Sequence, residues 1–179
     1  MSFQSIVRAP GALLASDALT IRVVSLRMKS KQLHGLRGLK ILLGAEVDDD
    51  DTAIAALPGD ISPDEVRAAI TGGPIKGGVG RLVVEPDAMT GGQSINARLT
   101  GEVADLAKEF QKLQGGSTWE PVLNLGAFRK DISLELLSSV LEGVSLTFDE
   151  LIIMPLFPGE ETARYDLNPI EDDDTDADD

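Results

Sequence analysis

The chain has 179 residues, of which 42% are apolar, with no cysteine, one histidine and a formal charge of −14 at pH 7. This length supports one domain with a full hydrophobic core. The lack of cysteine excludes disulfides, thiolate catalysis and cysteine-ligated zinc or iron–sulfur sites. No signal peptide is visible at the start of the chain, and the apolar runs are too short to span a bilayer, so we expect a cytoplasmic location.

The charge is divided unevenly along the chain. Residues 1–47 carry seven basic and two acidic groups, whereas residues 48–179 carry nine basic and 28 acidic groups. Such a division suggests head-to-tail self-association, with a basic region of one copy against an acidic region of the next. Solubility is the alternative reason for the acidic excess. The last nine residues, 171–179, include seven acids and predict a disordered tail after one domain over residues 1–170.

The first predicted element is a half-buried strand over residues 18–29. Apolar and polar residues alternate through Val23, and after a slip of one residue the alternation resumes at Leu26, which indicates a β-bulge. The polar side of this strand and the residue just beyond it form a candidate basic face for partner contact. Its members are Arg22, Arg27, Lys29 and Lys31.

The next segment lacks a clear helical signal. Gly35 and Gly38 argue against a helix, so the alternating residues 39–43 predict a second strand. The aspartate run 48–51 predicts a surface loop, and residues 52–57 predict a short helix.

A well-marked helix follows in residues 61–73. Ser62 is a favourable N-cap, Pro63 suits the first helical position, and Glu65 completes a capping box. Gly72 can end the helix in the left-handed conformation.

The second half of the chain predicts a short strand at 81–84, helices at 100–115 and 131–143, and a buried strand at 144–154. The first of these helices is the strongest, because five apolar residues lie on one face at helical spacing: Val103, Leu106, Ala107, Phe110 and Leu113. The fold class expected is α+β, with an antiparallel or mixed β-sheet and about three packed amphipathic helices.

The glycine-rich segment 73–84 contains part of a phosphate-binding loop pattern. A P-loop needs a lysine and a serine or threonine after its second glycine, whereas Gly80 is followed by Arg81 and Leu82. The predicted order is also reversed, since a helix precedes the segment and a strand follows it. We therefore predict a flexible loop without nucleotide, in which Lys76 and Arg81 contact carboxylates of a neighbouring subunit.

No metal, cofactor or catalytic residue is predicted. An EF-hand loop counted from Asp48 would place Thr52 at position five and Gly59 at position twelve, so the pattern fails, and only loose divalent binding stays open. His34 has no carboxylate near it in sequence, so we expect it to be a packed or surface side chain.

These features predict a non-enzymatic structural or assembly subunit, of the kind found in the virion or tail of a tailed phage or in a related injection apparatus. Its partners would be other protein subunits, including copies of itself held by charge-complementary contacts. The acidic arm, represented by Asp172, Asp173 and Asp174, would take part. One alternative is an acidic regulator that imitates DNA or occupies a basic partner, and another is a small enzyme using carboxylates and a divalent ion. The net charge argues against nucleic acid as a partner.

Overall fold

The computed structural model describes residues 2–3, 21–43, 51–87, 91–114, 120–156 and 161–168. Within these ranges the chain forms nine strands and four helices. The strands are β1 (Ser2–Phe3), β2 (Ile21–Met28), β3 (Thr52–Pro58), β4 (Ile70–Thr71), β5 (Ile75–Pro86), β6 (Gln93–Gly101), β7 (Val122–Ala127), β8 (Ser145–Pro155) and β9 (Ala163–Asp166). The helices are α1 (Ser30–Leu42), α2 (Pro63–Ala69), α3 (Glu102–Gln114) and α4 (Leu134–Leu141).

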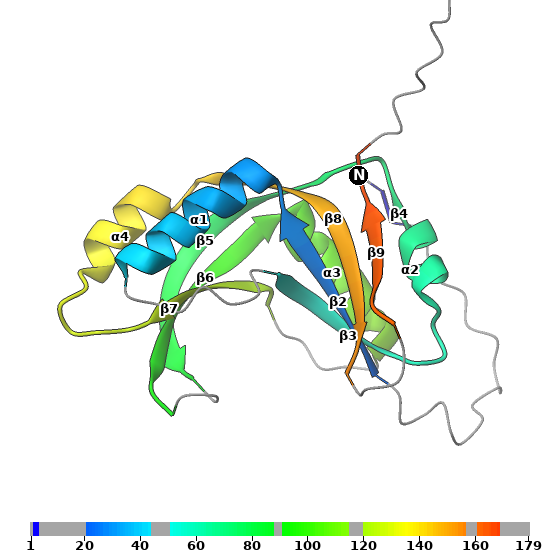
Figure 1. Ribbon diagram of the computed structural model, residues 1–179, viewed down its shortest axis with the longest axis horizontal. Helices are drawn as coiled ribbons and strands as arrows, with labels where there is room; N and C mark the ends of the chain where they lie inside the picture. The colour runs from blue at the N-terminus through cyan, green and yellow to red at the C-terminus, as the bar shows by residue number, and fades with distance from the viewer. Residues whose placement is uncertain are drawn as a thin grey trace, which may run out of the picture.

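Seven strands form one antiparallel sheet in the order β3-β2-β8-β5-β6-β7, with β9 added beside β8. The sheet curves into an arch, with α1 and α4 beside one end and α2 and α3 at the other (Figure 1). The short strands β1 and β4 pair separately. The predicted α+β class with an antiparallel sheet is confirmed.

The element order repeats within the sheet. The units β2-α1-β3-α2-β5 and β6-α3-β7-α4-β8 follow the same pattern, apart from the two-residue strand β4. In each unit the first two strands pair with each other, and the last strand pairs with the first strand of the other unit: β5 with β6 and β8 with β2. The exchanged strands β5 and β8 also pair with each other at the centre of the sheet. The two units are therefore interlocked.

Three helices pack apolar residues against the seven-stranded sheet: α1 and α3 bury theirs, and α4 buries its leucines in part. Helix α3 packs on β3, α1 on β7, and α4 on β5. The α3 stripe is fully buried at Val103, Leu106, Ala107 and Phe110, as the sequence predicts. At about 25 cal/mol per Å² of apolar surface removed from water, such stripes supply most of the driving force for packing.

The prediction of a strand at residues 39–43 is wrong, because these residues belong to helix α1 or follow it directly. The helix buries Leu33, Leu36 and the residue Lys40, which recur at helical spacing. Gly35 lies on the exposed side with open space around it. A glycine costs a helix about 1 kcal/mol, and the buried leucines outweigh that cost.

The predicted helix at residues 52–57 is also wrong, since this segment is strand β3. The three alanines in this segment favour a helix locally, but pairing with β2 and burial of Ile54 and Leu57 stabilise a strand. The sequence predicts a bulge within β2, but the extra residues lie in the two strands that pair with it. Ile54 of β3 and Asp149 of β8 have no residue opposite them in β2. Strand β2 itself stays regular.

The glycine-rich segment is a strand and not a flexible loop, since β5 runs through it without a break. A Cβ atom on Gly77 would lie 2.7 Å from Cγ1 of Val103, and one on Gly80 would lie 2.9 Å from Cγ2 of Thr100. These glycines therefore let β6 and α3 approach the backbone of β5 closely.

Helices α2, α3 and α4 and strand β8 agree with the sequence-based expectations, whereas β6, β7 and β9 lie where no strand was predicted. At α4 the Ser133 hydroxyl accepts a hydrogen bond from the N–H of Leu136 and caps the helix. The acidic segment 171–179 lies outside the described residues.

Replacing Ser62 by alanine is expected to destabilise the fold by about 1 kcal/mol. The Ser62 side chain accepts a bond from the N–H of Glu65, and the Ser62 N–H donates to the Glu65 carboxylate at 2.8 Å. The backbone N–H and the hydroxyl of Ser62 hold the pKa of Glu65 below its ordinary value of 4.5. Because this pKa is lowered in the folded state, the contribution is present above pH 4.5 and is lost as the pH falls through the folded-state pKa.

Urea denaturation of the wild type and Ser62→Ala at neutral and acidic pH measures this difference. The gap in unfolding free energy should narrow on acidification. A gap that widens would contradict the role given to the Glu65 carboxylate.

Candidate functional site

Strand β6 separates an apolar face from a polar face by simple alternation. Ile95, Ala97 and Leu99 belong to the hydrophobic core, whereas Asn96 and Arg98 point to the opposite side of the sheet. The polar face of β6 therefore brings a cation and an amide next to strands β5 and β7.

Arg98 is held by two carboxylates from neighbouring segments. Its Nη2 lies 2.5 Å from Oε1 of Glu85 on β5, and its Nε lies 3.4 Å from Oε2 of Glu120, just before β7. The Asn96 amide donates to the other oxygen of Glu85 at 2.9 Å. These bonds fix the guanidinium, which is 30% exposed and can still reach a ligand.

A cavity of about 620 Å³ opens beside this arginine. Its size falls in the range of small-molecule sites. Arg98 shares the lining with Arg81 of β5 and with Asp105 and Lys108 of α3, while Glu120 lies at the rim. The sequence pattern points to Arg81 but not to Arg98, Asp105, Lys108 or Glu120. These four residues come from three separate segments, β6, α3 and the entrance to β7, which no local pattern connects.

Arg81 supplies the uncompensated charge of the cavity. It is exposed, and among the residues that the structure describes it has no hydrogen-bond or ion-pair partner. Lys108 lies 3.2 Å from Asp105 across one turn of α3, with both side chains exposed. Arg98 is paired with Glu85 and Glu120 and Lys108 with Asp105, so Arg81 is the cation of the cavity that no described carboxylate pairs with, and an anion is favoured next to it.

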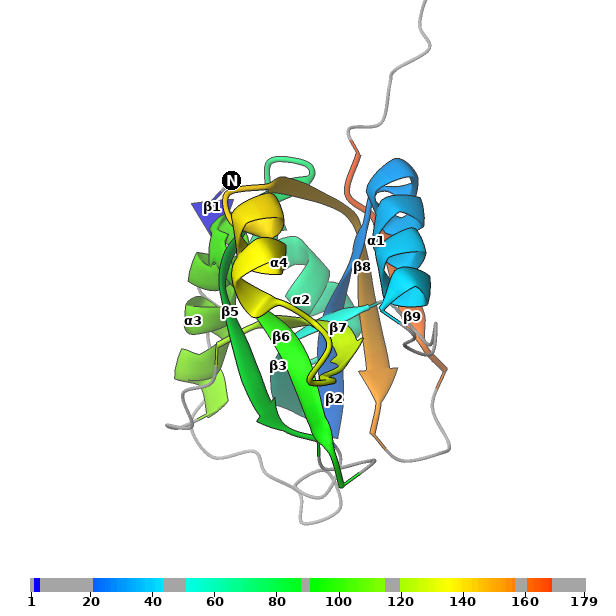
Figure 2. The ribbon, with the colours of Figure 1, turned by 90° about the vertical axis from the view of Figure 1, so that its left-hand side faces the viewer.

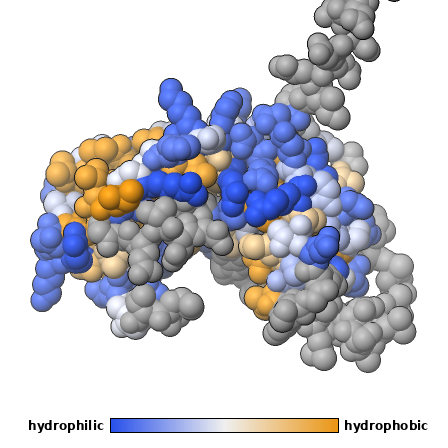
Figure 3. Space-filling model, viewed as in Figure 1, coloured by the Kyte–Doolittle hydropathy of each residue, from blue (hydrophilic) through white to orange (hydrophobic). Residues whose placement is uncertain are grey.

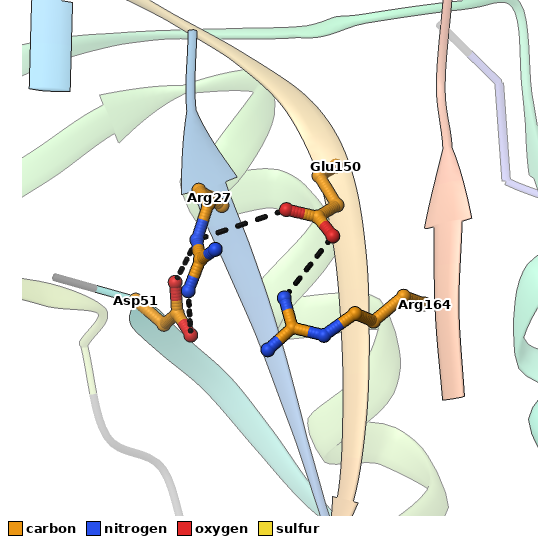
Figure 4. Close-up of polar contacts among 4 residues, drawn as sticks. All are labelled: Arg27, Asp51, Glu150 and Arg164. Atoms are coloured by element: carbon orange, nitrogen blue, oxygen red, sulfur yellow. Dashed lines mark hydrogen bonds and ion pairs between the residues drawn. The ribbon is translucent and has the colours of Figure 1, made fainter. Parts of the chain in front are cut away.

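Arg27 forms a second arginine cluster in the other unit of the fold (Figure 4). Its Nε and Nη2 donate to Asp51 at 2.7 and 3.1 Å, and Glu150 lies 3.7 Å from the Nε. Arg164 of β9 donates to the other oxygen of Glu150 at 3.1 Å.

The two clusters occupy equivalent places in the two units. In each, an arginine on the first strand meets a carboxylate just before the second strand and a carboxylate on the exchanged strand. Asp51 is almost fully buried and binds Arg27 in a bidentate pair, whereas Glu120 is 74% exposed and leaves Arg98 more open. The cluster of Arg98 is therefore the one suited to an external ligand.

The basic residues selected from the sequence do not share one face. Arg22 and Arg27 lie on opposite faces of β2, because they are five positions apart, an odd number, on a regular strand. The Arg22 guanidinium donates to the backbone carbonyls of Gly59 and Ile61, the latter at 2.8 Å. Lys29 precedes α1, and Lys31 is exposed on its first turn.

The remaining selected residues are also separated. The backbone N–H of Lys76 donates to Glu102 at 2.8 Å, and this bond lowers the pKa of the Glu102 carboxyl. Arg81 alone lies in the cavity. The acidic residues 172–174 lie outside the described ranges.

No metal site is found in the part of the chain that the structure describes, where no three metal-binding side chains come together. Of the aspartate run, Asp51 is described, and its carboxylate is engaged by Arg27. His34 is exposed, and its Nδ1 lies 2.8 Å from the carbonyl oxygen of Ser30 in the same helix. Within the described ranges, no helix combines the length and the apolar character needed to cross a bilayer.

Asp149 and Glu150 both line a cavity of about 360 Å³. On a regular strand, two adjacent residues would point to opposite faces of the sheet and would not share a cavity. The bulge at Asp149 breaks the alternation of β8 at this point.

No family model and no curated protein matches this chain. Solved structures do. Apo LigT of E. coli has a TM-score of 0.48 and 12% identity, over 84% of this chain and 98% of LigT. LigT complexed with 3′-AMP has a TM-score of 0.47 and 11% identity, over 84% of this chain and 99% of LigT. Usb1 of Kluyveromyces marxianus has a TM-score of 0.44 and 13% identity, over 82% and 98%.

These similarities correct the functional prediction from the sequence. None of the three is a virion or tail component, and LigT has been solved with 3′-AMP and with phosphate. The prediction of a non-enzymatic structural subunit of a phage or injection apparatus is therefore wrong, and so is the prediction that the chain is not an enzyme. The acidic regulator and the divalent-metal enzyme, which were its alternatives, are withdrawn with it.

Proposed function

We propose that this chain binds a small phosphate ester in the cavity beside Arg98 and Arg81 and acts on its phosphoester bond. The observation that carries the proposal is that Arg81, in a cavity that also contains Arg98 and Lys108, has no partner among the residues that the structure describes. A guanidinium can donate two parallel hydrogen bonds to a phosphate, which gives both charge and orientation.

The lining residues have distinct roles in this proposal. Arg81 binds the phosphate oxygens, and Arg98, oriented by Glu85 and Glu120, supplies a second fixed donor. Lys108 adds positive charge at the rim. Fixed donors stabilise charge on phosphoryl oxygens during bond cleavage, and the exposed Glu120 carboxylate can orient an attacking water molecule.

The substrate class is a short phosphate ester, which includes nucleotides and the ends of RNA chains. The net charge of −14 opposes a long polyanion but is a weak obstacle to a ligand with one or two phosphates. For short ligands, this proposal therefore replaces the expectation that the chain has no nucleic-acid partner.

Replacing Arg81 by alanine is expected to weaken phosphate-ester binding at least tenfold, because the substitution removes the cavity cation that has no carboxylate partner in the described part of the chain. Calorimetric titration with inorganic phosphate, 3′-AMP and adenosine measures this effect. Lys76→Ala is the matched control, since Lys76 is an exposed cation on the same strand outside the cavity. Binding should weaken with rising salt, and adenosine should not bind.

Two results would overturn binding at this cavity: equal affinities for 3′-AMP and adenosine, or equal losses of affinity in Arg81→Ala and Lys76→Ala.

Hydrolysis of bis(p-nitrophenyl) phosphate tests the proposal that the chain acts on the phosphoester bond. Turnover by the wild type and its loss in Arg98→Ala are expected, and binding without turnover of either phosphodiesters or 3′-AMP would overturn it.

Three further features expected from the sequence are also proposed for this chain. They are one domain over residues 1–170 with an acidic tail, a cytoplasmic location, and self-association through charged contacts. The partner contacts assigned to Arg22, Arg27, Lys29, Lys31 and Lys76, and to the tail, belong with them. Deletion of residues 171–179 followed by mass measurement at low and high salt tests the contribution of the tail.

A further inference from the structure

Helices α1 and α4 expose large apolar side chains on neighbouring surfaces. Ile41 and Leu42 of α1 are 66% and 81% exposed, and Leu136 and Val140 of α4 are 66% and 64% exposed. In the space-filling view, hydrophobic surface gathers at the end of the molecule where α1 and α4 lie (Figure 3). Single exposed apolar residues are normal, but a group of them on adjacent elements is typical of an interaction site.

The two helices also border an apolar groove. Both helices lie at the same end of the sheet (Figure 2), and residues of both line a cavity of about 280 Å³. Its walls include Leu36 and Leu39 of α1 and Leu141 of α4, and its floor includes Leu123 of β7. Gly35 lies at the α1 rim, and a Cβ atom added to it would meet no atom within 4 Å, so another chain can approach the helix backbone there.

The charges of the two helices are opposite. Helix α1 contains Lys31, Arg37 and Lys40 and no acidic residue. Lys40 is buried, and Arg37 and Lys40 already have interactions within the chain, so the exposed Lys31 is the cation that a docking chain can reach. Helix α4 with its C-cap contains Glu135 and Glu142 and no basic residue. Each helix is therefore complementary to the other in charge, while both expose apolar side chains.

We propose that a second copy of this chain docks on the surface formed by α1 and α4, in a two-fold symmetric dimer. A two-fold axis brings α1 of one copy against α4 of the other and forms the same contact twice. The apolar side chains supply the affinity, and the opposite charges fix the register and exclude α1 against α1. This proposal does not rest on the phosphate-ester site, which lies in a different cavity.

Replacing Leu42 or Leu136 by serine is expected to weaken the dimer at least tenfold, as measured by sedimentation velocity over a range of protein concentrations. Leu156→Ser is the matched control. Leu156 is 53% exposed, and its N–H bonds to the carbonyl of Ile21, at the end of β2 opposite to α1. Circular dichroism of each variant checks that the fold is retained.

A charge exchange tests the orientation of the two copies. Lys31→Glu and Glu135→Lys should each weaken the dimer at low salt, and the double variant should recover affinity, because the exchanged charges again face opposite partners. A wild-type chain that stays monomeric at all concentrations would overturn the proposal. A dimer that Leu42→Ser and Leu156→Ser weaken to the same extent would also overturn it. A monomer whose groove binds an apolar dye would overturn it as well.

Discussion

Replacing Gly77 by alanine is expected to destabilise the fold by about 2–3 kcal/mol. The added methyl group would lie 2.7 Å from Cγ1 of Val103 and 3.1 Å from the carbonyl oxygen of Thr100. Val103 is fully buried, and the Thr100 oxygen belongs to the backbone of the adjoining strand. Neither neighbour can move without displacing α3 from the sheet, so the strain cannot be relieved locally.

The matched control for this prediction is Gly38→Ala, the same substitution where nothing lies within 4 Å. Because alanine favours a helix over glycine, this variant is expected to gain about 0.5–1 kcal/mol. Urea denaturation at low protein concentration measures both variants. Changes of the same sign would contradict the close packing of β5 against β6 and α3.

Replacing Phe110 by alanine is expected to destabilise the fold by about 3–5 kcal/mol. Phe110 has no exposed surface, and its ring fills the core between α3 and the sheet. Truncation leaves a cavity at the centre of the α3 contact, which the surrounding strands cannot close. The same denaturation experiment measures the loss.

Leu156→Ala is the control for the loss of apolar volume at an exposed position, and a change within about 0.5 kcal/mol is expected there. Since α3 also supplies Asp105 and Lys108 to the candidate cavity, Phe110→Ala should weaken phosphate-ester binding as well. Similar stability losses in Phe110→Ala and Leu156→Ala would contradict the central place of Phe110 in the core.

The candidate site could be predicted from the sequence only in part. Arg81 stands out as a cation in a glycine-rich segment, and the alternation through Ile95, Ala97 and Leu99 could have indicated the polar face of Arg98. No sequence signal joins these residues to Lys108 or Glu120, because the cavity is assembled from β5, β6, α3 and the entrance to β7.

The sequence alone determined the elements whose local signals agree with their surroundings. The capping residues Ser62 and Ser133 mark α2 and α4, and the apolar period of residues 103–110 marks α3. The apolar faces of α2 and α3 are buried as expected, whereas that of α4 is only partly buried. In these segments, hydrogen bonding within a few residues and the direction of the core favour the same conformation.

Only the tertiary structure decided the rest. Residues 52–57 form a strand because they pair with β2. Residues 39–42 are helical because Leu33 and Leu36 of the same helix pack against the sheet. The exchange of β5 and β8 between the two units involves residues far apart in the chain. Such contacts depend on which distant surfaces meet, and local propensity carries no information about that choice.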